Sequence, residues 1–113
     1  MTINVYDTAN QLAKELPQTQ QFINLKLTYS KLKSDKIAYE MFKQFNQLQE
    51  EIQKKQANGE DINKDTEKLK NMVEKMEKMD AIKQLMSSEE AVNQLLMDIN
   101  KIITTPITDI YNQ

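Results

Sequence analysis

The scarcity of glycine and proline constrains this chain more than any other feature of its sequence. In 113 residues there is one glycine, Gly59, and there are two prolines, Pro17 and Pro106. Turns and sheets use both residue types heavily, because glycine adopts positive φ angles and proline fixes φ. The other residues are dominated by Glu, Gln, Lys, Leu, Met and Ala, which favour long helices. The sequence therefore predicts an all-α fold, a helical bundle in one domain spanning residues 1–113.

Capping residues and apolar spacings of three and four predict where the helices lie. Asn4 is placed to cap the first helix, and Leu16-Pro17 to end it. Ser34 or Asp35 marks the start of a third helix, and a capping box of Ser87 with Glu90 predicts a helix boundary or a kink near residue 87. We expect helices over about 4–15, 18–33, 35–57, 62–86 and 88–104, and a short turn over 106–111.

Residues 42–59, FKQFNQLQEEIQKKQANG, keep only one apolar line after Phe45 and continue without a break to Asn58-Gly59. Glycine suits the left-handed position just past a helix end, so the tip of an antiparallel helical hairpin is expected near residues 58–60. The next helix carries apolar residues at the a and d positions of a heptad, as in a coiled coil. The narrow apolar line shared by these two helices, here called the seam, consists of Phe45, Leu48, Ile52, Leu69, Met72, Met76 and Met79.

The seam has two interpretations. One narrow line buries little in an isolated hairpin, so a second chain covering it would add stability and make the protein a homodimer or higher homo-oligomer. Alternatively, the seam residues only fill the space between the two helices of the hairpin. The flexible methionines Met72, Met76 and Met79 also suit a surface that adapts to another protein.

The last long helix has the broadest apolar face of the chain. Its members are Val92, Leu95, Leu96, Ile99, Ile102 and Ile103. A broad face of this kind is typical of a buried helix. The sequence therefore places this helix at the centre of the bundle.

The residues argue against most kinds of catalysis. Without cysteine or histidine there is no thiolate, no imidazole base and no zinc or Glu-x-x-His di-iron site. Glu74 and Glu77 share a helix face, but Lys75 and Lys78 alternate with them, which indicates an ion-paired surface. The four tyrosines suit helix edges. We expect no enzyme, no catalytic or metal-binding residue and no cofactor.

Charge and hydropathy limit the partners and the location. All fifteen basic residues are lysine and they form no patch, so direct nucleic-acid binding is not expected. No apolar run approaches the ~20 residues that span a bilayer, and the N-terminus lacks the features of a signal peptide. We expect a cytoplasmic protein that does not bind membranes.

Three stretches together resemble the YheA-like branch of the YlbF/YmcA family, small helical proteins of Gram-positive bacteria. They are VYDTANQLAKEL at the start, LKSDKIAYEMFKQFNQLQEEIQKKQANGE in the middle and LLMDINKII near the end. The resemblance implies a helical, hairpin-bearing fold that self-associates. It also implies relatives that regulate competence, biofilm formation and sporulation by assembling with one another and influencing RNA processing. Cysteines of those relatives hold iron–sulfur clusters, and this chain has none to hold one.

The sequence thus predicts a non-catalytic protein that acts through self-association and through binding an unidentified protein partner. An accessory factor in RNA processing that also contacts RNA is the first alternative. A metal-dependent enzyme that uses only carboxylates is the second.

Overall fold

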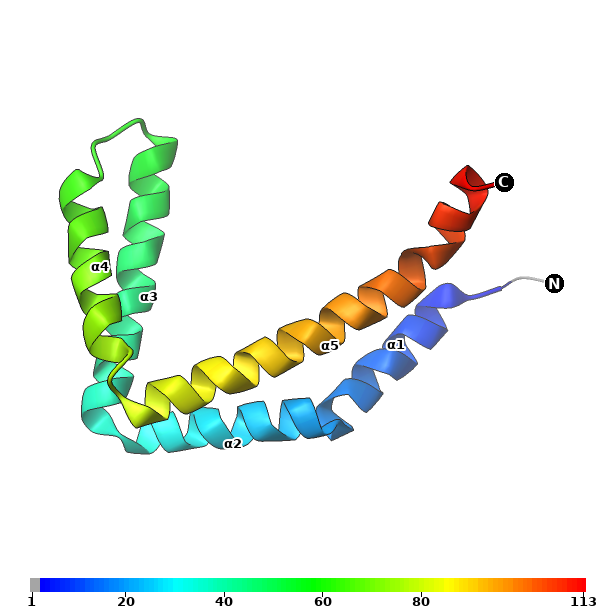
Figure 1. Cartoon of the computed structure of the whole chain (residues 1–113), viewed down its shortest axis with the longest axis horizontal. Coiled ribbons are helices and arrows are strands. Elements are labelled where there is room, and N and C mark those ends of the chain that lie inside the picture. Colours follow the sequence, from blue (N-terminus) through cyan, green and yellow to red (C-terminus); the bar gives the residue numbers. More distant parts are fainter. Residues whose placement is uncertain (1–2) are drawn as a thin grey trace. The chain divides into compact units, whose positions relative to one another are not determined.

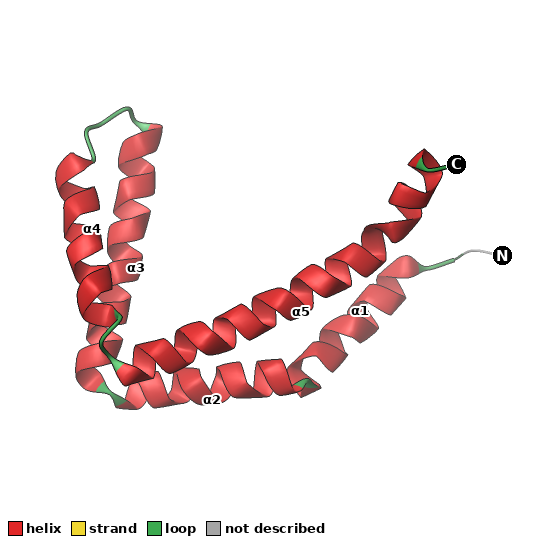
Figure 2. Cartoon of the chain, viewed as in Figure 1, coloured by secondary structure: helices red, strands yellow, loops and turns green. Residues whose placement is uncertain are grey.

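The computed structural model of the chain describes residues 3–113, and every element among these residues is a helix (Figures 1 and 2). The all-α prediction is therefore confirmed. The α-helices are joined by a short 3₁₀ turn and brief loops. In chain order they are α1 (Val5–Glu15), the 3₁₀ turn η1 (Leu16–Gln18), α2 (Gln20–Ser34), α3 (Lys36–Ala57), α4 (Asn63–Met76) and α5 (Asp80–Tyr111).

The helices form two compact units. The hairpin unit is Thr28–Met86, which contains α3 and α4. The terminal unit combines the N-terminal segment up to Leu27 with Ser87–Gln113. Both α2 and α5 contribute residues to each unit.

Three helix starts follow local hydrogen-bonding chemistry. The Asn4 side chain accepts from the backbone N–H groups of Tyr6 and Asp7, at 3.1 and 3.3 Å. The Thr19 hydroxyl accepts from the N–H of Phe22 in the first turn of α2. Asp35, rather than Ser34, caps α3, because its carboxylate accepts from the N–H of Ala38 at 3.1 Å. These side chains satisfy amides that have no partner inside their own helix.

The tip of the hairpin is a Schellman motif centred on Gly59. Gly59 has a φ of 72°, the left-handed conformation that favours glycine. Its N–H donates to the carbonyl of Gln56, and the N–H of Glu60 donates to the carbonyl of Lys55. These two bonds satisfy the last carbonyl groups of α3 and reverse the chain. This turn lies in the region where the tip near 58–60 is expected.

The predicted helix over 62–86 is wrong in extent, because the structure divides it at Glu77–Met79. α4 ends at Met76, where the N–H of Met79 bonds to the Met76 carbonyl three residues back and tightens the last turn. Both Met76 and Ile82 are buried on either side of this break. No glycine or proline marks this position in the sequence.

Of the boundary or kink predicted near residue 87, the boundary is wrong, since α5 runs through this position without interruption. Leu85, Ser88 and Val92 are all buried, and their spacing places them on one face of α5. Burial along that face outweighs the preference of Ser87 for a capping position.

Pro106 lies inside α5 rather than at the start of a separate turn. Proline has no N–H, so the carbonyl of Ile102 receives no helical hydrogen bond from it. The hydroxyl groups of Thr104 and Thr105 donate to the carbonyls of Asn100 and Lys101, which favours a bend. The ribbon of α5 bends over its last turns (Figure 1).

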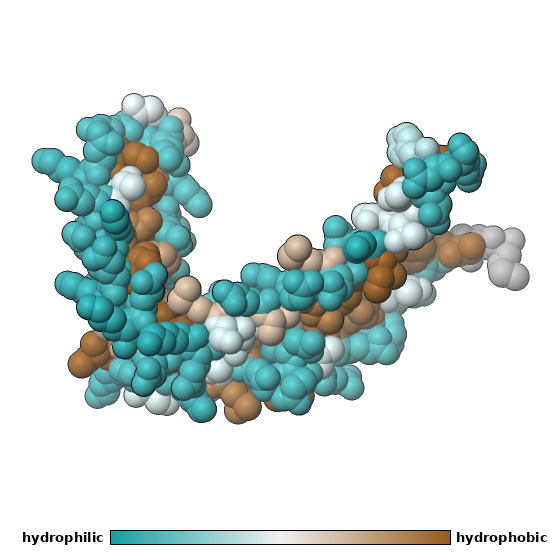
Figure 3. All heavy atoms as spheres, viewed as in Figure 1, coloured by the Kyte–Doolittle hydropathy of each residue, from teal (hydrophilic) through white to brown (hydrophobic). Residues whose placement is uncertain are grey.

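The hairpin unit holds most of the buried apolar residues. α3 packs against α4, and Figure 3 shows a line of apolar residues between them. Leu32 and Ile82 are its most completely covered large side chains. In the described part of the terminal unit, only Ser88 and Val92 are buried, at 9% and 7% exposure.

Candidate interaction surface

The seven seam residues all lie in the hairpin unit. Leu48, Met72 and Met76 are buried within the single chain. The other four are half-buried, and they are Phe45, Ile52, Leu69 and Met79. Packing of α3 against α4 thus covers a large part of the seam, as the hairpin interpretation expects. Association of two chains through the seam stays a prediction.

A small pocket lies on the flank of the hairpin. Its volume is about 150 Å³, and it is lined by Gln44, Gln47, Leu48, Glu51, Lys68 and Met72. Sites for drug-sized ligands and cofactors usually measure ~300–1,000 Å³ and are mostly apolar. The pocket is therefore too small and too polar to suggest a cofactor site.

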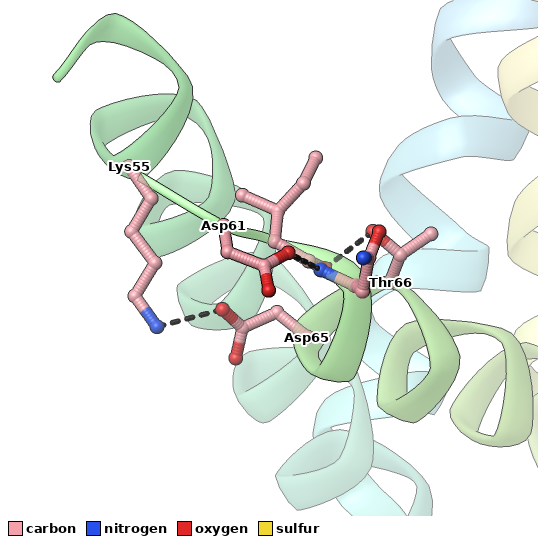
Figure 4. Close-up of polar contacts among 6 residues, drawn as sticks. Lys55, Asp61, Asp65 and Thr66 are labelled. Carbon is pink, nitrogen blue, oxygen red and sulfur yellow. Dashed lines mark hydrogen bonds and ion pairs between the residues drawn. The ribbon is translucent and has the colours of Figure 1, made fainter. Parts of the chain in front are cut away.

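A single ion pair ties the end of α3 to the start of α4 (Figure 4). The Lys55 Nζ donates to the Asp65 carboxylate at 2.6 Å. This hydrogen bond, together with the negative charge of Asp65, raises the pKa of Lys55 above its ordinary value of 10.5. The Asp61 carboxylate accepts from the N–H of Asn63 at 2.9 Å and so supports the start of α4. The cluster stabilises the turn and offers no reacting group.

The acidic residues do not converge on a cation site. Over residues 3–113, no group of three or more acidic side chains is arranged to hold a metal ion. Glu74 in α4 and Glu77 at its C-cap are both exposed. They lie on a solvated surface with lysines beside them.

Two tyrosines make contacts within the hairpin unit. The rings of Tyr29 and Phe42 pack edge to face, with centroids 6.5 Å apart. The Lys33 ammonium lies 5.1 Å from the centroid of Tyr29, and the Lys43 ammonium lies 4.9 Å from that of Tyr39. These contacts fit tyrosines at helix edges.

The prediction that the last helix forms the centre of the bundle is wrong for its C-terminal half. Val92 is 7% exposed, whereas Ile102 and Ile103 are 71% and 61% exposed. Ile107 and Ile110, which continue the same apolar face, are 56% and 65% exposed. The sequence shows that this face is apolar, but the described chain does not cover it.

The N-terminal segment exposes apolar residues at the same end of the terminal unit. The start of α1 and the last turns of α5 lie there together (Figure 1). We call these exposed residues the end patch: Ile3, Val5, Tyr6, Ile102, Ile103, Ile107, Ile110 and Tyr111. The sequence identified Val5, Ile102 and Ile103 as apolar but did not show that they are exposed, and it placed residues 106–111 in a separate turn. The spacing of Ile103, Ile107 and Ile110 carries the signal past the proline.

Charged residues are unevenly divided between the two units. The chain has 17 acidic residues and 15 lysines. The terminal unit holds almost half of the chain but few of these charged residues. They are Asp7, Lys14, Glu15, Lys26, Glu89, Glu90, Asp98, Lys101 and Asp109. Depletion of charge around exposed apolar side chains is typical of the core of a protein interface. Within residues 3–113, no helix has the length and apolar character needed to cross a membrane.

A solved structure supports the fold. The chain is similar to a structure described as a protein of unknown function (DUF964) from Bacillus stearothermophilus, with a TM-score of 0.86 and 21% sequence identity. The match covers 96% of each chain. At that identity the similarity shows the fold alone.

Related sequences identify the family. The chain is 42% identical to a UPF0342 protein of Lactiplantibacillus plantarum over 114 aligned positions, which cover all of both chains. It is 43% identical to a UPF0342 protein of Lacticaseibacillus casei over 109 positions, or 96% of each chain. The family model described as "Control of competence regulator ComK, YlbF/YmcA" matches residues 5–108. The resemblance found in the sequence is confirmed, and the chain belongs to the YlbF/YmcA family.

Proposed function

We propose that the chain is a non-catalytic regulatory protein of the cytoplasm that acts by binding proteins, both further copies of itself and a different partner. The observation that carries this proposal is the exposed, charge-poor apolar face of the terminal unit. Exposed apolar side chains gathered at one end of a small protein mark an interaction site more often than a solvated face.

The family supports a regulatory role. Its description names control of a competence regulator. A protein that is not an enzyme can control another protein only by binding to it. The exposed apolar surfaces offer sites for such binding. Two surfaces are available, the half-buried part of the seam and the end patch.

The chemistry of the described residues supports a role without catalysis. The pKa of Lys55 is raised, and its hydrogen bond and ion pair with Asp65 account for the shift. Catalytic acids and bases usually stand out by pKa shifts produced by burial or like charges in a cleft. Lys55 lies instead at the end of a helix, with its side chain partly exposed.

The apolar side chains at the end of the terminal unit are sufficient for a reversible complex. Burying one aliphatic side chain completely contributes roughly 1.5–3 kcal/mol. Ile3, Val5 and the four patch isoleucines of α5 are between 56% and 82% exposed. Covering all six would therefore contribute about 6–12 kcal/mol, against a cost of association of roughly 4–15 kcal/mol. The balance fits a regulatory complex that forms and dissociates.

Affinity purification from the native cell tests the proposal. The bait carries its tag on a long flexible linker, and bound proteins are identified by mass spectrometry. We expect a defined protein to be retained by the wild type and by Ile37→Asp, whose site is exposed on α3. The double variant Ile103→Asp/Ile107→Asp should lose it. If the wild type retains only the proteins found with an unrelated bait of equal size, binding to a different protein is refuted.

A further inference from the structure

We infer that the end patch is a homodimer interface, in which the patch of one chain packs against the same patch of a second copy around a two-fold axis. The inference rests on the proposed function, since it assigns the self-association to one surface and one geometry. It differs from the expectation that two chains meet along the seam.

The apolar stripe of α5 continues beyond the part of the helix that other described residues bury. Val92, Leu96, Ile99, Ile103, Ile107 and Ile110 follow each other at steps of three and four, so they occupy one face of the helix. Along this face Val92 is 7% exposed, Leu96 is 40% exposed and Ile99 is half-buried, whereas Ile103, Ile107 and Ile110 are 61%, 56% and 65% exposed. The pattern of the residues does not change where the cover ends. A helix that ended in solvent would be expected to become polar there.

The apolar residues of α1 are also more exposed toward the start of the helix. Leu12 and Leu16 are half-buried, whereas Val5 and Tyr6 are 64% and 78% exposed. Both ends of the chain are therefore apolar at the same end of the terminal unit. Any second copy brings the same two apolar segments to the contact, as a two-fold interface requires.

The size of the patch matches what a stable dimer needs. Aliphatic side chains of this size each present about 60–120 Å² of apolar surface, and tyrosine side chains about 150–250 Å². At the observed exposures, the eight residues together offer roughly 500–900 Å² per chain. Standard protein interfaces bury ~800 Å² on each partner. The patch alone thus supplies most of one side of such an interface.

The distribution of charge favours a second copy over a charged partner. After Glu90, the charged residues of α5 are Asp98, Lys101 and Asp109. At 100° per residue, all three lie on the side of the helix away from the apolar stripe. The stripe members of the patch, Ile103, Ile107 and Ile110, can therefore meet their copies without opposing like charges, whereas Ile102 lies on the side of Asp98 and Asp109. A strongly charged partner would find no complementary group on this face.

Light scattering behind a sizing column at 10–100 µM tests the inference. We expect the wild type to have twice the 13.2 kDa mass of one chain. Ile103→Asp/Ile107→Asp should have the mass of one chain, with a dissociation constant raised at least 100-fold. Both sites are more than half exposed, so the substitutions spare the fold, and far-UV circular dichroism checks this. If the double variant loses helicity, Ile107→Lys alone provides the same test.

Ile37→Asp is the matched control, because Ile37 is a 74% exposed isoleucine outside the patch. It should remain dimeric. A wild-type dimer that survives the patch substitutions overturns the inference and leaves self-association to another surface, such as the seam. A monomeric wild type overturns both the inference and self-association. A different protein that depends on the patch would then be the true occupant, and binding of that protein is judged by the affinity purification.

Discussion

The Nζ of Lys55, in the last turn of α3, lies 2.6 Å from a carboxylate oxygen of Asp65 in the first turn of α4. The same lysine provides the carbonyl that accepts from the N–H of Glu60 in the Schellman motif. One residue therefore ties the hairpin together through its backbone and its side chain. This arrangement makes the tip the most directly testable part of the fold.

The ion pair predicts a dependence of stability on alkaline pH. The folded-state pKa of Lys55 is raised above 10.5, so the contribution of the pair is fully present below pH 10.5. It is lost as the pH rises through the folded-state value, where the ammonium deprotonates. We expect Lys55→Met to melt at a lower temperature than the wild type at pH 8, and the difference to shrink above pH 11. Thermal melts followed by circular dichroism measure this.

Lys54→Met is the control for that experiment, since it removes an equal charge from the neighbouring exposed position. Its melting temperature should differ little from that of the wild type at any pH between 8 and 12. Equal effects of the two substitutions would show that the ion pair with Asp65 adds no stability.

Gly59→Ala should destabilise the hairpin through its backbone alone. No atom lies within 4 Å of the position that an added Cβ would take, so the substitution causes no clash. The φ of 72° nevertheless remains unfavourable for alanine, at a cost of about 1–2 kcal/mol. Urea denaturation measures this loss. Asn58→Ala, at an ordinary φ of −93°, should change the free energy of unfolding by less than about 0.5 kcal/mol.

Ile82→Ala should be among the most destabilising substitutions in the hairpin unit. Ile82 is 1% exposed, and truncating a buried isoleucine typically costs about 2–5 kcal/mol. Ile37→Ala removes the same atoms from a site that is 74% exposed, and should cost less than about 0.5 kcal/mol. Chemical denaturation of both variants at one protein concentration gives the comparison. A similar loss at the two sites would contradict the burial of Ile82.

Pro106→Ala should strengthen the end of α5. Alanine restores an N–H that can donate to the carbonyl of Ile102, and proline inside a helix costs ~3 kcal/mol relative to alanine. We expect slower hydrogen exchange of the amides over residues 107–111, with little change in the hairpin unit. Unchanged exchange at these amides would mean that the last turns fray whether or not the proline is present.

Local chemistry made the caps and the tip predictable from the sequence. Asn4, Asp35 and Gly59 each act within a few residues of their own position, so the printed sequence contains both partners of each interaction. The helix break at Glu77–Met79 and the continuity of α5 through Ser87 depend instead on which side chains are buried. Local patterns do not contain that information.

For the candidate surface too, the sequence predicted which residues are apolar but not which of them are exposed. Spacing identified the seam and the apolar face of the last helix as apolar, and the structure shows Met72 and Met76 buried in the hairpin. Spacing did not show that Ile102 and Ile103 are exposed, because periodicity shows which residues share a helix face and not whether another element buries that face. The sequence also placed Ile107 and Ile110 in a separate turn after Pro106, whereas the structure includes them in α5.

The position of the two chain ends has a practical consequence for anyone who labels this protein. Because the start of α1 and the last turns of α5 share the apolar end of one unit, a fluorescent protein fused directly to either terminus would sit on that surface and mask it. The exposed loop after Ala57 belongs to the other unit and has no side chain against its glycine. A small epitope or dye placed in that loop is therefore the better reporter of assembly in living cells.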